Sequence, residues 1–224
     1  MTRGKKYQKA FGNIDSSATH SIAEAVAFVK ENAFAGFDES FEAHIVLGID
    51  RKKTDQHVRG AVVLPHGVGK AIRIAVLTST KQGEAKEAGA NLVGAEDLIE
   101  SITSGSIDFD VLVATPEMMP KLAPVAKILG PRGLMPSPKT GTVTPKVSEV
   151  VAELKKGRVS FKNDNGGVVH AALGRVSFSK EALSENLTVF LDTVRRMKSS
   201  SVKGSFIRQV SVCSTMGPSV IVNV

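Results

Sequence analysis

Tryptophan is absent from this 224-residue chain, and tyrosine and cysteine each occur once. Because Cys213 has no second cysteine to pair with, an intramolecular disulfide is excluded, and we expect no cysteine-based zinc site and a reducing compartment. No apolar run approaches the roughly 20 residues that cross a bilayer. The basic N-terminus is not followed by the apolar stretch of a secretory signal. These absences predict a cytoplasmic protein without a membrane partner.

Motifs for catalysis, metal ions and nucleotides are also missing. No GxSxG elbow is present. The segment PHGVGK (65–70) lacks the GxxxxGK[ST] spacing, has Ala71 in place of the hydroxyl residue and precedes a predicted strand. We therefore expect no enzyme activity and no cofactor, with a nucleotide-using α/β enzyme as the weaker alternative. The histidines have no pair at i, i+3 or i, i+4, which predicts no metal site; they are His20, His44, His57, His66 and His170.

Positive charge exceeds negative charge, and the excess is uneven. The formal net charge is +7; residues 67–157 hold 11 Lys and Arg against 10 Asp and Glu, whereas the two flanking pieces hold 18 against 12. A basic face on a soluble protein favours a polyanionic partner, with a solvated face that aids solubility as the alternative. Because tryptophan is absent and tyrosine occurs once, a sheet that stacks several bases is disfavoured. Cations, hydroxyls, backbone groups and shape suit a folded RNA better than a single strand.

The flanking pieces together have the pattern of one α+β domain. Ser21 and Glu24 form a predicted capping box that starts a helix ending near residues 32–36, and a second helix is predicted over 179–198. Strands are predicted over 41–49, 62–64, 158–164, 167–174 and 204–217, and the turn Asn165-Gly166-Gly167 joins two of them as a hairpin. Two cationic segments are predicted as an arm and a loop, 1–19 with Arg3, Lys5, Lys6 and Lys9, and 49–60 with Arg51, Lys52, Lys53 and Arg59. We assign residues 1–66 and 158–224 to a split βαβ-type, ferredoxin-like domain.

Residues 67–157 follow a different rhythm, in which strands alternate with helices. The run 71–79 is almost continuously apolar, as in a strand buried on both faces. Further strands are predicted over 91–94 and 110–116, and helices over 83–90, 95–102, 117–129 and 148–156. The alternation predicts a parallel sheet in a three-layer, Rossmann-like α/β domain inserted into the first domain. Acids dominate 84–117 and bases dominate 118–157, so one end of this unit should be positive.

The segment Leu129–Val143, LGPRGLMPSPKTGTV, holds three prolines, three glycines and two cations but no acid. Proline fixes φ and glycine permits positive φ, which excludes a regular helix or strand. A loop of this length inside a compact domain is typically functional or disordered, and Arg132, Lys139 and free backbone N–H groups suit an anion. A plain connection between two helices is the alternative.

Two short stretches in the flanking pieces are candidate RNA-binding elements. Residues 36–40 place Phe37 beside polar residues just before a strand, with a core position for Phe37 as the alternative. Residues 211–218 form a hydroxyl-rich strand that breaks at Gly-Pro, and a period of two puts Ser211 and Thr215 on one face. Such a face can donate to phosphates and 2′-hydroxyls, with an exposed edge strand as the alternative.

Four motifs are distinctive in combination: FDES, LGIDRKKTDQHVRGAVVLPHGVGK, LGPRGLMPSPKTGTV and STMGP. In this order they resemble the bacterial L-one family of large-subunit ribosomal proteins, the proteins of the mobile lateral stalk, and the likeness runs from about residue 20 to 220. The resemblance implies a split α+β domain with an inserted Rossmann-like domain. It also implies binding of a folded segment of large-subunit ribosomal RNA, chiefly through the first domain.

The resemblance further implies which residues contact the RNA. The matching positions are Phe37, Ser40, Glu42, Ser211, Thr215, Met216 and Gly217, with Lys162, Asp164 and His170 as weaker candidates. Three positions depart from the family pattern, because Gly36 replaces a usual Lys or Arg, Cys213 a hydroxyl residue and His57 an Asn. These departures weaken individual contacts, and the change at Gly36 removes one expected phosphate contact.

Two further roles are implied by the resemblance alone. The stalk moves with deacylated tRNA as it leaves the exit site, and the inserted domain supports those contacts. Many bacterial members also bind their own mRNA and repress its translation, because the messenger mimics the ribosomal RNA site. We expect a monomer off the ribosome. A repressor that acts mainly away from the ribosome is the alternative.

Overall fold

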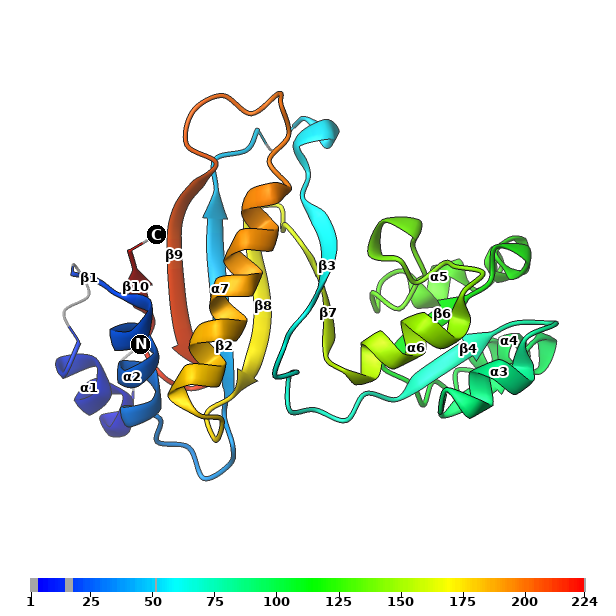
Figure 1. The fold of residues 1–224 in the computed structure, drawn as a ribbon, viewed down its shortest axis with the longest axis horizontal. Helices are drawn as coiled ribbons and strands as arrows, with labels where there is room; N and C mark the ends of the chain where they lie inside the picture. Colours follow the sequence, from blue (N-terminus) through cyan, green and yellow to red (C-terminus); the bar gives the residue numbers. More distant parts are fainter. Residues whose placement is uncertain (1–3, 15–17, 51, 224) are drawn as a thin grey trace. The chain divides into compact units, whose positions relative to one another are not determined.

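The chain is a mixed α/β protein whose described strands form three sheets. The computed structural model describes residues 4–14, 18–50 and 52–223, so Arg3 and Arg51 of the two predicted cationic segments lie outside the described residues. Two compact units are present, unit 1 with Met1–Gly69 and Val159–Val224, and unit 2 with Lys70–Arg158 (Figure 1). Each unit has its own core.

Unit 1 is built on a five-stranded sheet in the order β1-β10-β9-β2-β8. The strands are β1 (Thr19–His20), β10 (Val220–Val222), β9 (Ile207–Ser214), β2 (Ser40–Leu47) and β8 (Val168–Arg175). The central strand β2 pairs antiparallel with both β8 and β9, and β1 pairs parallel with β10. The sheet therefore draws its strands from both ends of the chain.

Helices cover one face of this sheet. Within unit 1, α2 (Ile22–Glu31) and α7 (Lys180–Arg196) pack on the side that holds Phe41 and Ile45 of β2, and α7 lies along this face in Figure 1. Alternate residues of β2 are only half-buried, so the sheet has a second, open face. The predicted capping box is confirmed, because the Glu24 N–H donates to Ser21 Oγ at 3.3 Å and the Ser21 N–H donates to Glu24 Oε2 at 3.0 Å.

The basic N-terminal segment is partly helical, contrary to the expectation of an arm without regular structure. Helix α1 spans Lys5–Gly12. Tyr7 and Phe11 are four residues apart and stack with ring centroids 6.1 Å apart, while Ala10 is buried. This i, i+3, i+4 spacing of apolar residues is the helical signal that the high charge of the segment obscured.

The predicted hairpin at residues 165–167 is wrong in one respect. The turn forms, with the Asp164 N–H donating to the Val168 carbonyl at 2.8 Å, and Asn163 makes a single bridge to Val169. The flanking strands then separate, because β7 (Arg158–Lys162) pairs with β3 (Arg59–Val63) in a two-stranded sheet whereas β8 pairs with β2. The Asn163 side chain accepts a hydrogen bond from the Val58 N–H at 2.8 Å. Because Val58 directly precedes β3, this bond holds the end of β7 next to β3. A short 3₁₀ turn, η1 (Thr54–Gln56), precedes β3.

Unit 2 is built on a parallel three-stranded sheet in the order β5-β4-β6. Its strands are β5 (Leu92–Gly94), β4 (Ile74–Leu77) and β6 (Val111–Ala114), and its helices include α3 (Gln82–Glu87), α4 (Glu96–Thr103) and α6 (Val147–Lys155). All of β4 is buried, with Ala75 and Leu77 in one core cluster and Ile74 and Val76 in another. The prediction of a strand buried on both faces is confirmed.

The helix predicted over 117–129 is mostly wrong. The chain instead forms two 3₁₀ turns, η2 (Pro116–Met118) and η3 (Pro120–Leu122), and only a short α5 (Ala126–Leu129). Pro120 and Pro124 each lack the N–H that an α-helix needs and clash with the preceding turn. Leu122 and Leu129 are nevertheless buried. The apolar spacing therefore correctly predicts which residues enter the core, whereas the prolines determine the backbone conformation.

The segment 129–143 is irregular, as its prolines and glycines predict, but it is folded onto unit 2. Its one regular piece is η4 (Pro138–Thr140), and Val143 makes an isolated parallel bridge to Ala114. Leu134 and Met135 pack against the core. Arg132 and Lys139 are exposed, so its role in binding an anion stays a prediction.

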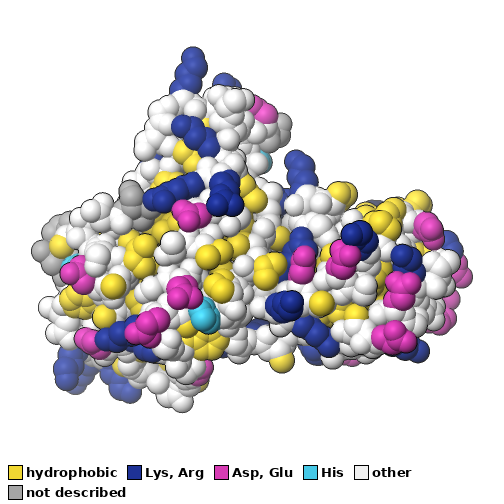
Figure 2. All heavy atoms as spheres, in the orientation of Figure 1, with side chains coloured by type: hydrophobic (Ala, Val, Ile, Leu, Met, Phe, Trp, Pro, Cys, Tyr) yellow, Lys and Arg dark blue, Asp and Glu magenta, His cyan; other side chains and the backbone are white. Residues whose placement is uncertain are grey.

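Charged side chains are distributed differently over the two units. On the face drawn in Figure 2, acidic and basic side chains of unit 2 are interspersed, and Lys121 lies 2.6 Å from Glu96. On unit 1, Lys and Arg side chains gather at the end that carries the loops before β3 and β9. A hollow there is lined by Lys53, Lys203 and Arg208 among others. Among the described residues, no helix is long and apolar enough to cross a membrane.

Candidate nucleic-acid interface

Two segments that are far apart in the sequence meet where β2 begins and β9 ends. The Ser40 N–H donates to Thr215 Oγ1 at 2.9 Å, and the Thr215 N–H donates to the Ser40 carbonyl at 3.1 Å, across a separation of 175 residues. We call residues 37–40 and 214–217 together the joined edge. The structure therefore brings together Phe37, Ser40 and Thr215, which sequence reasoning had proposed separately.

A buried carboxylate, Glu39, holds the joined edge together. Its side chain is 2 % exposed; Oε1 accepts the N–H groups of Phe34 and Ala35 at 3.0 and 2.8 Å, and Oε2 accepts the Met216 N–H at 3.0 Å. Burial acts to raise the pKa of Glu39, but hydrogen bonds from the Ser214 hydroxyl and these N–H groups outweigh it and lower the pKa. Sequence reasoning missed this residue, because an acid directly before a strand has no distinctive pattern.

The joined edge displays two large apolar side chains to solvent. Phe37 is 57 % exposed and Met216 is 52 % exposed. Gly217 closes the tight turn that follows β9: its N–H donates to the Ser214 carbonyl at 3.2 Å, and a Cβ at this position would lie 2.4 Å from Ser214 Oγ. Exposed apolar groups at the end of a strand, held by a buried carboxylate, indicate a contact surface and not a core. The alternative of a buried core position for Phe37 is excluded.

Cations surround the joined edge on two sides. A hollow beside Met216 is also lined by Lys5, Lys6 and Tyr7 of α1. Arg175, at the end of β8, donates to the Asp38 carbonyl at 3.0 Å and to Ser40 Oγ at 3.1 Å. Neither the α1 lysines nor Arg175 was proposed from the sequence as part of this site, because only the fold brings them near residues 37–40.

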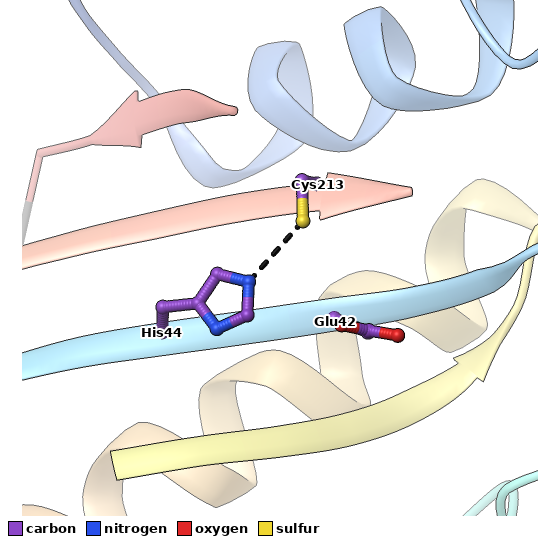
Figure 3. Close-up of side chains that lie close together, drawn as sticks. All are labelled: Glu42, His44 and Cys213. Atoms are coloured by element: carbon purple, nitrogen blue, oxygen red, sulfur yellow. Dashed lines mark hydrogen bonds between the residues drawn. The ribbon is translucent and has the colours of Figure 1, made fainter. Parts of the chain in front are cut away.

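The open face of the sheet carries a row of polar side chains next to the joined edge. In the antiparallel register, His44 lies opposite both His170 of β8 and Ser211 of β9, and Glu42 lies opposite Cys213. All five alternate with buried neighbours and are half-buried or exposed. Figure 3 shows Glu42, His44 and Cys213 on their two adjacent strands. The candidates Glu42, His170 and Ser211 therefore share one surface.

The histidines on this face are linked to one another and to the thiol. His44 Nδ1 lies 2.8 Å from His170 Nδ1, and His44 Nε2 lies 3.2 Å from Cys213 Sγ. Burial lowers the pKa of His44, and the neighbouring His170 lowers it further. Burial raises the pKa of the Cys213 thiol to about 11, with Glu42 and Glu39 contributing in the same direction. At neutral pH the face therefore carries a neutral imidazole and a protonated thiol.

The remaining candidates lie elsewhere in unit 1. Asp164 is in the turn before β8, and its Oδ2 lies 3.6 Å from His170 Nε2, which places it at the end of the polar row. Lys162 is exposed at the end of β7, in the two-stranded sheet, and is not part of either surface. Ser211 lies on the open face, but the Thr215 hydroxyl is beyond the strand and is engaged by the Ser40 N–H.

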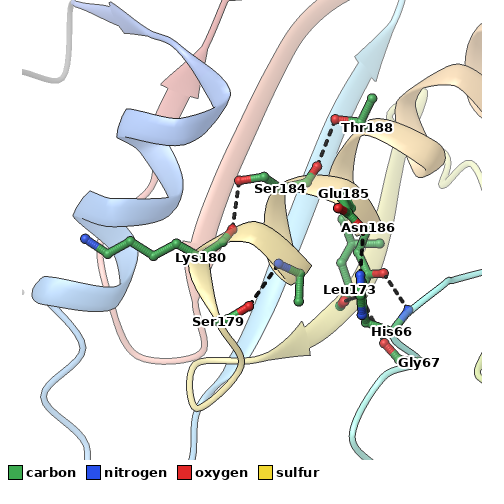
Figure 4. A network of polar contacts seen from close by, with 10 residues as sticks. His66, Gly67, Leu173, Ser179, Lys180, Ser184, Glu185, Asn186 and Thr188 are labelled. Atoms are coloured by element: carbon green, nitrogen blue, oxygen red, sulfur yellow. Dashed lines mark hydrogen bonds and ion pairs between the residues drawn. The ribbon is translucent and has the colours of Figure 1, made fainter.

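The segment 65–70 is the connection from unit 1 to unit 2 and not a phosphate loop. Asn186 of α7 is fully buried; its Nδ2 donates to the Gly67 and Leu173 carbonyls at 3.1 and 2.8 Å, and its Oδ1 accepts the His66 N–H at 3.2 Å (Figure 4). The backbone groups of His66 and Gly67 are thus fixed to unit 1 just before the chain enters unit 2. The following element is strand β4 and not a helix, as the sequence indicated.

Comparison with known proteins gives a consistent likeness over the whole chain. The model of the "Ribosomal protein L1p/L10e family" matches residues 29–218. A protein of Prochlorococcus marinus strain MIT 9301 named "Large ribosomal subunit protein uL1" is 52 % identical over 225 residues, covering 100 % of this chain and 96 % of the relative. A protein of the same name from Synechococcus sp. strain CC9605 is 50 % identical, covering 98 % of this chain and 93 % of the relative.

Proposed function

Because the chain belongs to the ribosomal protein L1p/L10e family, we propose that it binds a folded segment of large-subunit ribosomal RNA through unit 1. Membership makes it a structural protein of the large subunit of the cytoplasmic ribosome, and its relatives are named as ribosomal proteins and not as enzymes. The observation that carries the proposal is the joined edge, in which exposed Phe37 and Met216 stand on a rigid, hydrogen-bonded frame.

The chemistry of the joined edge suits a pre-shaped RNA. Phe37 and Met216 offer apolar area to an unstacked base or to the face of a ribose. The hydroxyls of Ser40 and Thr215 belong to the same edge, and Gly217 lets the RNA backbone approach closely. Because the frame is fixed before binding, little ordering entropy is lost on association. We infer that this edge supplies most of the specificity.

The open face extends the proposed contact along the sheet. Glu42, His170 and Ser211 offer both hydrogen-bond acceptors and donors to 2′-hydroxyls and base edges. Contacts of this kind recognise RNA without involving its phosphates. Asp164 lies at the far end of this row. Lys162, on the separate two-stranded sheet, is proposed only as a peripheral phosphate contact.

Long-range attraction comes from the positive charge of the flanking pieces, which hold 18 Lys and Arg against 12 Asp and Glu. Lys5 and Lys6 lie beside the joined edge, and Lys53, Lys203 and Arg208 line a hollow at the other loops of unit 1. These groups position the RNA backbone without reading its sequence.

Two further roles are proposed on family membership. Movement with deacylated tRNA as it leaves the exit site requires a unit that reaches the tRNA, and the exposed Arg132 and Lys139 of unit 2 suit such a contact. Repression of its own mRNA requires only that the messenger present the same shape to unit 1. The tRNA contact is therefore assigned to unit 2, and mRNA binding to the RNA-binding surface of unit 1. Neither role needs a catalytic site.

Removal of unit 2 tests the assignment of RNA binding to unit 1. Replacing residues 70–158 by a short Gly-Ser linker is expected to leave a module that melts cooperatively, since unit 1 keeps its own core. Its affinity for a folded ribosomal RNA segment, measured by filter binding, should stay within about threefold of the whole chain, a difference of roughly 0.7 kcal/mol. A folded module without affinity would assign the RNA site to unit 2.

Restoring a cation beside Phe37 is expected to tighten binding. A Cβ at Gly36 meets no atom within 4 Å and its φ is not positive, so Gly36→Arg is accommodated. One added phosphate contact should raise affinity roughly fivefold at ~0.15 M salt and steepen the log–log salt dependence by about 0.7–0.9. Gly83→Arg, at an equally open position in unit 2, is the matched control and should change neither quantity. Equal effects of both variants would mean that only net charge matters.

A further inference from the structure

On the open face, Glu42, already proposed as an RNA contact, lies beside two side chains that the RNA-binding proposal does not use, His44 and Cys213. We propose that Glu42, His44 and Cys213 bind a zinc-class divalent metal ion. One potential ligand atom from each lies within 4.8 Å of the other two, and all three residues are half-buried, so the group is accessible from solvent. The residues come from β2 and β9, whose register is fixed by the ladder on both sides of the group (Figure 3).

The distances are close to those of an occupied site. In a tetrahedral site with zinc–sulfur and zinc–nitrogen bonds of about 2.3 and 2.0–2.1 Å, the sulfur and nitrogen lie roughly 3.5 Å apart. His44 Nε2 and Cys213 Sγ lie 3.2 Å apart. A small opening of this pair therefore suffices, and the Glu42 carboxylate, within 4.8 Å of a ligand atom of each residue, has to move closer to become the third ligand.

Neighbouring groups orient the His44 ring for metal binding. The Asp164 carboxylate faces His170 Nε2 at 3.6 Å, which favours a proton on that nitrogen. His170 Nδ1 then accepts from the Nδ1–H of His44 at 2.8 Å. This arrangement leaves the lone pair of His44 Nε2 directed at Cys213, whereas the reverse arrangement would set a lone pair of His170 against a carboxylate. Ligating histidines in metal sites are held in the same way by a hydrogen bond at their second nitrogen.

The donor set selects the class of metal. A thiolate, an imidazole and a carboxylate suit Zn²⁺ and its spectroscopic substitute Co²⁺, and disfavour Mg²⁺ and Ca²⁺, which prefer oxygen ligands only. On binding, the metal–sulfur bond replaces the S–H bond of Cys213, and one proton is released to solvent. No electron transfer is involved. The inference does not depend on the proposed RNA binding, because its ligands are identified by their own geometry and its test contains no RNA.

The test uses the whole chain and its single cysteine. Co²⁺ titration of the reduced protein is expected to give a thiolate-to-cobalt charge-transfer band that saturates at one ion per chain. Zn²⁺ should displace the cobalt and protect Cys213 from alkylation by iodoacetamide, measured by mass spectrometry. Because the chain has one cysteine, alkylation reports on this thiol alone. Absence of the band, or unchanged alkylation at saturating Zn²⁺, would overturn the proposal.

Variants distinguish a built site from a thiol that binds metal by itself. Cys213→Ser should abolish the band, and His44→Gln and Glu42→Gln should each weaken Co²⁺ binding at least tenfold. His170→Ala should weaken it by roughly 10–100-fold through loss of the orienting hydrogen bond. His66→Gln, which removes a histidine paired with Glu185 elsewhere in unit 1, should leave it unchanged. Full affinity in His44→Gln or Glu42→Gln, with melting as in the wild type, would show that the three residues do not act together.

Discussion

Met216→Asp is expected to lower the affinity for folded ribosomal RNA about a hundredfold while leaving the fold intact. The Met216 side chain is 52 % exposed, and its backbone N–H, which donates to Glu39, is unaffected by the change. The variant loses the burial of a methionine, roughly 1.5–3 kcal/mol, and sets a carboxylate against the RNA backbone. A loss of about 2.8 kcal/mol corresponds to a hundredfold in the dissociation constant.

The measurement is a filter-binding titration beside a thermal melt. Thr188→Glu is the matched control, since it adds the same charge at an exposed position of α7, on the helix-covered side of the same unit. Thr215→Val is a less clean variant, because the Thr215 hydroxyl accepts the Ser40 N–H and its loss disturbs the frame. Affinity within threefold of the wild type for Met216→Asp would remove the joined edge from the RNA site.

Glu39→Ala is expected to lower the free energy of unfolding by about 3 kcal/mol. Removal of the buried carboxylate leaves the N–H groups that donate to it without an acceptor, and unpaired buried donors are costly. It should also weaken RNA binding, since the segments 34–39 and 214–217 lose their shared anchor. Denaturant unfolding monitored by circular dichroism measures the first effect. Glu31→Ala, which removes an exposed carboxylate that pairs with Lys180, should cost less than about 1 kcal/mol. Equal losses for the two variants would mean that Glu39 anchors nothing.

The lowered pKa of Glu39 adds a pH dependence to the same prediction. Because the folded-state pKa lies below the ordinary value of 4.5, the stabilisation is complete above that value and is lost as the pH falls through the folded-state pKa. Glu39→Gln cannot ionise, so its stability should decline less steeply with acid over this range. If the free energy of unfolding fell equally steeply with decreasing pH in the wild type and in Glu39→Gln, the pH dependence would belong to other carboxylates.

Most of the fold is predictable because its local signals agree with its packing. Ser21 and Glu24 cap α2 as their spacing predicts, and the buried strand β4 follows from an uninterrupted apolar run. The errors arise where two signals conflict. In residues 117–129 the apolar spacing indicates a helix, but Pro120 and Pro124 remove backbone donors and produce 3₁₀ turns. At residues 165–167 the turn chemistry is right, but pairing with more distant strands decides where β7 goes.

The candidate site was accessible from sequence mainly through family likeness. Phe37 and Thr215 have no local signal that joins them, and the bond between Ser40 and Thr215 spans 175 residues. Glu39 and Arg175 were missed because their importance lies in what the fold places around them. For the same reason, no sign of a metal site was visible in the sequence. The histidines and Cys213 have no ligand spacing along the chain, but pairing of β2 with β9 places His44 Nε2 3.2 Å from Cys213 Sγ. Spacing rules detect ligands on one element and are blind to ligands paired across strands.

The order of strands in unit 1 has a consequence for biosynthesis. The central strand β2 is translated early, but its partner β9, and β10 on the other side of β9, are translated only after the whole of unit 2. A nascent chain therefore exposes residues 37–40 without Thr215 and Met216 until β9 and the residues that follow it have left the exit tunnel. On the proposed assignment of the RNA site, a fragment that stops before β9 lacks the joined edge and should not bind the RNA there.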